Sequence, residues 1–192
     1  MKKYELTDEY IEIGLVTKIK LYRIKALVTI ASIGVSAGDL GGYVEKESNL
    51  DQSGNAWVFD DAEVYGNAKV FDDAWVYGNA KVCGNARVFG NAEVCGNAWV
   101  FDDAEVFGNA EVCGNARVCE RSDIVWFSNV GTEYGTLTVF KTKQGVLWVT
   151  RGCFSDSVEE FLKKSAEVHD EKTKREYQLL IEVAKSRLEE TQ

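Results

Sequence analysis

GNAWVFDDAEVYGNAKVF, residues 54–71, consists of three six-residue units, and eight further units follow without a gap as far as residue 119. In all eleven units the third residue is Ala and the fifth is Val. Two residues separated by one position lie on the same face of a strand, and a Gly-Asn or Asp-Asp pair tolerates the backbone of a sharp corner. A short, strict period of this kind indicates a solenoid in which each unit supplies one strand and one corner.

The repeat resembles the hexapeptide-repeat family of left-handed parallel β-helices. This resemblance implies three hexads in each triangular coil, with "ERSDIV" (120–125) as a degenerate twelfth unit. We therefore predict a mainly β protein with about four coils over residues 54–125, stacked at a strand spacing of about 4.8 Å. Residues eighteen positions apart are expected to lie directly above one another.

The segments outside the repeat predict two caps: an N-terminal β segment at 1–53 and a C-terminal β-hairpin with two helices at 126–192. "YELTDEYIEIG" (4–14) and "TKIKLYRIKALVTI" (17–30) are typical of two pairing strands that would cover the open end of the solenoid. "TLTVFKTKQGVLWVTRG" (136–152) predicts a hairpin that turns at 143–145. Two helices should follow, with capping boxes at Ser157/Glu160 and Thr173/Glu176.

The paired carboxylates at the corners are interpreted as backbone geometry rather than as a catalytic or metal site. The Asp-Asp pairs begin at residues 60, 72 and 102, and no two of these positions differ by eighteen. The carboxylates are therefore dispersed over the coils instead of forming a ladder. The cysteines and the single histidine also lack the spacing of a zinc site, so no metal or cofactor is expected.

Binding must then come from the outward side chains, which form aromatic columns. One face carries a column of Phe residues, the second carries Trp over Trp and Phe over Tyr, and the third places Trp99 between Lys81 and Arg117. A monomer rarely exposes such columns, so we expect a homodimer or homotrimer, a cover formed by the termini, or a partner protein. The candidate contact residues are Trp57, Phe59, Phe71, Trp75, Tyr77, Phe89, Trp99 and Phe107.

Charge and cysteine content limit the class of partner and the compartment. Lys and Arg number 22 against 31 Asp and Glu, a net charge of −9, which argues against direct nucleic-acid binding and favours a basic protein surface. The sequence shows neither a signal peptide nor a stretch long enough to span a membrane, and a cytoplasmic location is expected. Cys95 and Cys113 lie one coil apart and are expected to pack as small apolar residues rather than to form a disulfide.

"LYRIKAL", "GDLGGYVE", the Gly-Asn-Ala-x-Val units, "GCF", "EEF" and "IEVAK" together are similar to a group of small phage- or prophage-encoded β-solenoid proteins. This resemblance implies a phage setting. With the acidic charge and the aromatic columns, it favours a non-catalytic inhibitor of a host antiviral-defence complex, for example a CRISPR-type effector in the host cytosol.

Three alternatives remain. The first is a sponge for a small nucleotide signal at subunit interfaces, using Lys81, Trp99 and Arg117. The second is a structural or oligomerisation scaffold, and the third is a degenerate hexapeptide acyltransferase. An enzyme is not expected, because the hexads contain no histidine and His169 with Cys153 lacks an orienting third group.

Overall fold

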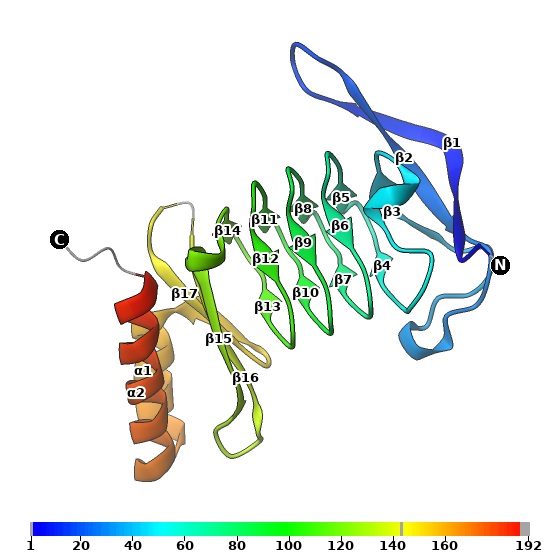
Figure 1. Cartoon of the computed structure of the whole chain (residues 1–192). Coiled ribbons are helices and arrows are strands. Elements are labelled where there is room, and N and C mark those ends of the chain that lie inside the picture. Colours follow the sequence, from blue (N-terminus) through cyan, green and yellow to red (C-terminus); the bar gives the residue numbers. More distant parts are fainter. Residues whose placement is uncertain (1, 143, 189–192) are drawn as a thin grey trace.

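The computed structural model describes residues 2–142 and 144–188 of the chain. An N-terminal hairpin, a stack of solenoid coils, and a C-terminal sheet with two helices follow one another along the molecule (Figure 1). The N-terminal hairpin and the C-terminal helices lie at opposite ends of this arrangement.

The eleven hexads form eleven two-residue strands, β4 to β14. Residues eighteen apart pair in parallel, as Trp57 pairs with Trp75 and Val58 with Val76, so the predicted period of three hexads per coil is confirmed. The strands form three ladders, β5-β8-β11-β14, β4-β7-β10-β13 and β6-β9-β12. Their bounds are Trp57–Val58, Glu63–Val64, Lys69–Val70, Trp75–Val76, Lys81–Val82, Arg87–Val88, Glu93–Val94, Trp99–Val100, Glu105–Val106, Glu111–Val112 and Arg117–Val118.

The interior of the solenoid is the predicted prism of Ala and Val. The Ala and Val side chains of all eleven hexads are 0–1% exposed. Val suits the pleated strand because it is β-branched, and Ala leaves room where the chain approaches the corner. The mainly β fold with a solenoid of about four turns is therefore confirmed.

The corners explain why Asp can replace Gly in some units. Asp60, Asp72 and Asp102 have φ values of 52°, 59° and 51°, in the left-handed region that the corner glycines also occupy. The carboxylate of Asp60 accepts a hydrogen bond from the backbone N–H of Gly78 at 3.1 Å, and that of Asp72 from Gly90 at 3.3 Å. The Asp60 and Asp72 carboxylates thus bond to the next corner, which agrees with the interpretation of the Asp-Asp pairs as backbone geometry.

The N-terminal segment begins the solenoid as well as capping it. Strands β1 (Tyr4–Ile13) and β2 (Ile19–Ala26) form the predicted antiparallel hairpin, and β2 pairs with β3 (Leu40–Val44). Strand β3 then pairs in parallel with β5, and Leu50 bridges in parallel to Val70. The stacking therefore starts ahead of residue 54, because Val44 and Leu50 occupy core positions that a strict hexad count does not detect.

A four-stranded antiparallel sheet follows the last coil, in the order β15-β16-β17-β18. "ERSDIV" is not a twelfth hexad, because residues 121–123 form a 3₁₀ turn and Ile124 starts β15, which pairs antiparallel with β16. The predicted hairpin is β16–β17, although its residue 143 lies outside the described residues. The strands are Ile124–Val130, Gly135–Lys141, Leu147–Arg151 and Phe154–Ser157.

Two helices pack on this sheet: α1 (Val158–Val168) and α2 (Glu171–Leu188). Ser157 caps α1 as predicted, because its hydroxyl accepts from the backbone N–H of Glu160. The predicted cap at Thr173 is wrong. The carboxylate of Asp170 accepts from the Thr173 backbone N–H at 2.8 Å, so α2 begins one turn earlier than the box suggested.

Candidate protein-binding face

One solenoid face keeps a partly exposed aromatic column, built at the ends of β6, β9 and β12, in which Phe71 and Phe89 are half-buried and Phe107 is exposed. Phe71 stacks on Phe89 with ring centroids 4.8 Å apart, and Phe89 stacks on Phe107 at 5.0 Å, with interplanar angles of 4° and 9°. The parallel ladder produces this stack, because it repeats one side-chain position every eighteen residues. We call this surface the phenylalanine face, defined by Phe71, Phe89, Phe107, Lys69, Arg87 and Glu105.

A cation lies in the middle of the phenylalanine face. The Arg87 guanidinium is 5.2 Å from the ring centroids of both Phe71 and Phe89, and it pairs with Glu105 at 3.2 Å. Phe107 is 37% exposed, and its ring meets the edge of Trp126 at a centroid distance of 4.5 Å. Stacked aromatic rings around an arginine are typical of protein-interface anchors.

An open depression of about 550 Å³ adjoins the N-terminal end of this column. Its lining combines Phe71 and Arg87 with the segment from Glu47 to Gln52. The phenylalanine face is therefore a ridge beside a depression rather than a flat surface, and a partner of complementary shape can dock on it.

The second aromatic face is largely covered. Trp57 is only 1% exposed, because Tyr4 packs against it edge-on with ring centroids 6.2 Å apart. The expected exposure of Trp57 is therefore wrong. Trp75 is half-buried, with Phe59 against it at 6.2 Å. The N-terminal segment has folded back over this face, which was one of the three covers considered.

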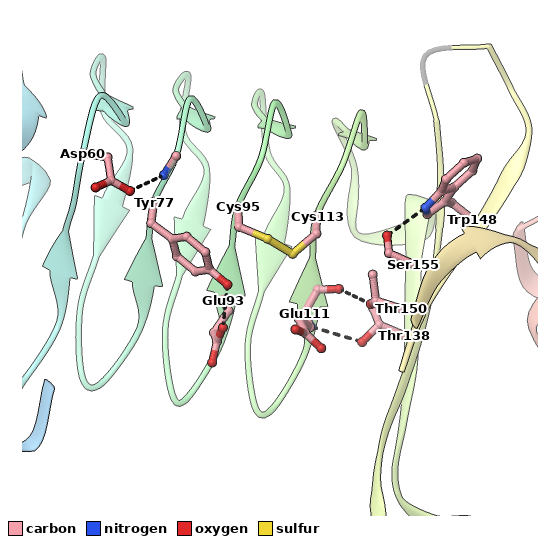
Figure 2. The surroundings of a disulfide bond; sticks show 11 residues. Asp60, Tyr77, Glu93, Cys95, Glu111, Cys113, Thr138, Trp148, Thr150 and Ser155 are labelled. Atoms are coloured by element: carbon pink, nitrogen blue, oxygen red, sulfur yellow. Dashed lines mark hydrogen bonds between the residues drawn. A yellow bond between two sulfur atoms is a disulfide. The ribbon is translucent and has the colours of Figure 1, made fainter. Parts of the chain in front are cut away.

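Farther along this face the aromatic column gives way to polar groups and a disulfide (Figure 2). The Tyr77 hydroxyl donates to Glu93 at 3.0 Å, and burial together with the Glu93 charge raises the pKa of Tyr77 to about 12. Cys95 and Cys113 are joined by a disulfide, with a Cα–Cα distance of 4.6 Å. The expectation that these cysteines only pack is thus corrected, because the ladder spacing places stacked cysteines within the distance range of a disulfide.

The third face brings together Lys81, Trp99 and Arg117, the residues of the nucleotide alternative. These side chains already interact with one another and with Glu63. The Arg117 guanidinium lies 3.9 Å from the centroid of Trp99, and the Lys81 ammonium lies 5.9 Å away. Lys81 also pairs with Glu63 at 2.8 Å. Arg117 already stacks on Trp99 and the Lys81 charge is paired with Glu63, so this arrangement does not favour nucleotide capture.

His169 and Cys153, weighed above as a catalytic pair, lie at the end of α1 and between β17 and β18, respectively. His169 ends α1 and packs against Tyr177 at a centroid distance of 5.4 Å. Cys153 is exposed, and no hydrogen bond joins it to His169 among the described residues. Across residues 2–142 and 144–188, no three His, Cys, Asp or Glu side chains are placed to hold a metal ion.

The tip of the β1–β2 hairpin is an exposed feature that the sequence interpretation missed. Leu15 and Val16 are 103% and 97% exposed, and the hairpin projects away from the solenoid (Figure 1). The signal was present as an apolar pair that follows Gly14 between two polar strands. A projecting apolar pair of this kind offers a second contact point for a partner protein.

The comparison with protein families supports the repeat itself. The YdcK Beta solenoid repeat matches residues 80–96, which lie in the middle of the stack. No curated protein matches the sequence. The class that fold and repeat together define is a β-solenoid repeat protein.

None of the helices described is both long and apolar enough to cross a membrane.

Proposed function

We propose that this chain is a non-catalytic binding protein that contacts a partner protein through the phenylalanine face. The observation that carries the proposal is the partly exposed stack of Phe71, Phe89 and Phe107 around Arg87. A rigid ladder holds these side chains in place, so little conformational entropy is lost when a partner binds.

The partner we propose is a host protein complex with a basic surface, and the chain is then a phage-encoded inhibitor of antiviral defence. The net charge of −9 supports a basic partner, because complementary charge over the whole molecule speeds encounter. The phenylalanine face itself carries Lys69 and Arg87 against Glu105, so the carboxylates that meet a basic group are those of the adjoining depression, Glu47 and Asp51. The projecting Leu15–Val16 tip supports a contact at more than one point. A CRISPR-type effector, with its basic grooves for nucleic acid, has the required chemistry.

Self-association through the same face is the competing use of this surface, as a homodimer or homotrimer. Native mass spectrometry distinguishes the two uses when tagged protein is isolated gently from the bacterial host. The proposal expects a stoichiometric host protein on the wild-type chain and its loss from Phe89→Glu. The matched control is Tyr134→Glu, because Tyr134 is a 73% exposed aromatic residue outside the solenoid.

The results of these experiments distinguish partner binding from self-association and from catalysis. A bare oligomer that Phe89→Glu converts to monomer would assign the phenylalanine face to self-association instead. A partner retained equally by both variants would reject the face as the binding site. Incubation with acyl-CoA should give no turnover, and an acyl product would reject the non-catalytic assignment.

A further inference from the structure

A cavity of about 160 Å³ lies in the C-terminal unit between the β15–β18 sheet and the two helices, and its lining residues all lie between 132 and 177. Arg151 comes from β17, Ser165 from α1, and His169 from the end of α1. The cavity is therefore built by residues distant in sequence, and it is independent of the phenylalanine face.

Three of the residues that line this cavity each carry a polar side-chain atom that is buried without a hydrogen-bond partner. The atoms are Arg151 Nε, Ser165 Oγ and His169 Nδ1, and the described residues contain only two other such side-chain atoms. Ser165 is 3% exposed. A serine within a helix can donate its hydroxyl to the backbone carbonyl four residues earlier, but the Ser165 hydroxyl makes no such bond. Buried polar groups are nearly always paired, so three unpaired atoms around one cavity point to a ligand that pairs them.

The charge of the cavity is opposite to that of the chain. Arg151 and Lys164 line it, and Glu133 is the one carboxylate among the lining residues that the structure describes. Arg151 is held in position because its Nη2 donates to the Val130 carbonyl at 3.1 Å. A guanidinium beside an ammonium, a hydroxyl and an imidazole is suited to an anionic oxygen pair.

Two glycines of the β15–β16 turn make room for this arrangement. A Cβ at Gly135 would collide with the Arg151 guanidinium, and a Cβ at Gly131 would collide with the Tyr177 hydroxyl. Gly131 also has a φ of 69°, and its backbone N–H faces the Glu176 carboxylate at 3.3 Å. The turn is therefore shaped around the side chains of the cavity wall.

The remaining wall is aromatic. Phe154, Phe161 and Tyr177 form an edge-to-face cluster, with successive centroid distances of 5.4 and 5.0 Å. Since a water molecule occupies about 30 Å³ in the liquid, the cavity has room for about five waters or for one small organic molecule. We propose that this cavity binds a small organic carboxylate with an aromatic or branched apolar group, its carboxylate against Arg151 and Ser165 and its apolar part against the phenylalanines.

Benzoate is a suitable probe for the whole chain, followed by two-dimensional amide NMR, with benzamide as the uncharged analogue of equal shape. We expect saturable shifts confined to residues around the cavity, and binding of benzamide at least tenfold weaker. Ser165→Ala should weaken benzoate binding about tenfold, because a hydrogen bond to a charged group is lost. Lys164→Gln should weaken it about threefold, because this ammonium is exposed to solvent.

Ser186→Ala is the matched control, a serine on the exposed side of α2 whose replacement should leave benzoate binding unchanged. Ser165→Ala should also unfold at the same or a higher temperature than wild type, since it removes an unpaired buried hydroxyl. Absence of saturable shifts at millimolar benzoate would overturn the proposal. Equal binding of benzamide, or equal effects of Ser165→Ala and Ser186→Ala, would overturn it as well.

Discussion

At the scale of single residues, the stack places side chains eighteen positions apart against each other, and where the two are alike the result depends on their chemistry. Phe on Phe gives the phenylalanine face, and Cys on Cys gives the disulfide. Glu93 under Glu111 places two carboxylates on neighbouring strands. Burial, with the Glu93 charge as a smaller cause, raises the pKa of Glu111 above its ordinary value.

This raised pKa predicts the pH dependence of a Glu111→Gln variant. The folded chain binds more protons than the unfolded chain between the two pKa values of Glu111, so the free energy of unfolding falls as pH rises through that interval. Gln resembles the protonated carboxyl. The variant should therefore melt about 1–2 °C above wild type at neutral pH, and equally with it below the unfolded pKa of about 4.3.

Thermal unfolding followed by circular dichroism at both pH values checks this expectation. Glu105→Gln is the control, because Glu105 pairs with Arg87 and Arg121 and its loss should lower the melting temperature at neutral pH. A higher melting temperature for Glu111→Gln at low pH as well would assign the gain to something other than charge.

At the scale of elements, corner glycines that look alike in the sequence differ in the space that they leave for a side chain. A Cβ at Gly66 would meet the next corner, Gly84, at 3.2 Å, whereas a Cβ at Gly84 would meet the backbone nitrogen of Asp102 at 2.7 Å. Gly66→Asp repeats the arrangement of Asp60 over Gly78 and should cost about 1 kcal/mol or less. Gly84→Asp forces the coils apart and should cost about 3 kcal/mol or more. Urea unfolding of both variants tests this order, and equal losses would contradict it.

The disulfide links two neighbouring coils and should stabilise them. It closes a loop with a sequence separation of 18, for which the loss of unfolded-state entropy is about 3 kcal/mol. Cys95→Ala with Cys113→Ala should lower the urea midpoint accordingly, and a reductant should lower that of wild type equally. Cys153→Ala replaces an exposed free thiol and should change neither the urea midpoint nor its response to a reductant. A wild-type midpoint insensitive to reductant would reject a stabilising bond.

The elements show which features are predictable from the sequence and which are not. The hexad period predicts strands, corners and the buried Ala and Val, because each depends only on neighbours six or eighteen residues away. The burial of Trp57 depends on Tyr4, which belongs to a segment without a period, so no local pattern indicates it. The predicted start of α2 was wrong because both Asp170 and Thr173 are residue types that cap helices, and the sequence alone does not show which of them is used. The disulfide was readable from the same eighteen-residue count, and only an assumption about the compartment opposed it.

The candidate site also has one feature that the sequence predicts and one that it does not. The order Phe71–Phe89–Phe107 follows from the period alone, whereas its exposure depends on where both termini pack. The helix–sheet cavity had no sequence signal, because Arg151, Ser165 and His169 meet only after four strands and two helices have assembled.

At the scale of the whole molecule, the C-terminal unit closes the prism without extending its ladders. Phe140 from β16 is fully buried and belongs to the solenoid core rather than to the core beneath the helices. Thr138 and Thr150 bind the backbone of Glu111 at 3.1 and 2.6 Å (Figure 2). An open end would expose Val and Ala together with unpaired strand groups, which favour aggregation.

Because each coil contacts only its neighbours, damage to this cap should spread from one end. Phe140→Ala should cost about 3–4 kcal/mol and accelerate amide exchange in β12 to β14 more than in β4 to β6. Hydrogen-exchange mass spectrometry measures this gradient directly. Phe127→Ala is the control, since Phe127 packs on the core beneath the helices and its loss should loosen that unit while sparing the last coil. A uniform increase in exchange over all coils would instead mean that the solenoid unfolds as one cooperative unit, with the cap contributing no local stability.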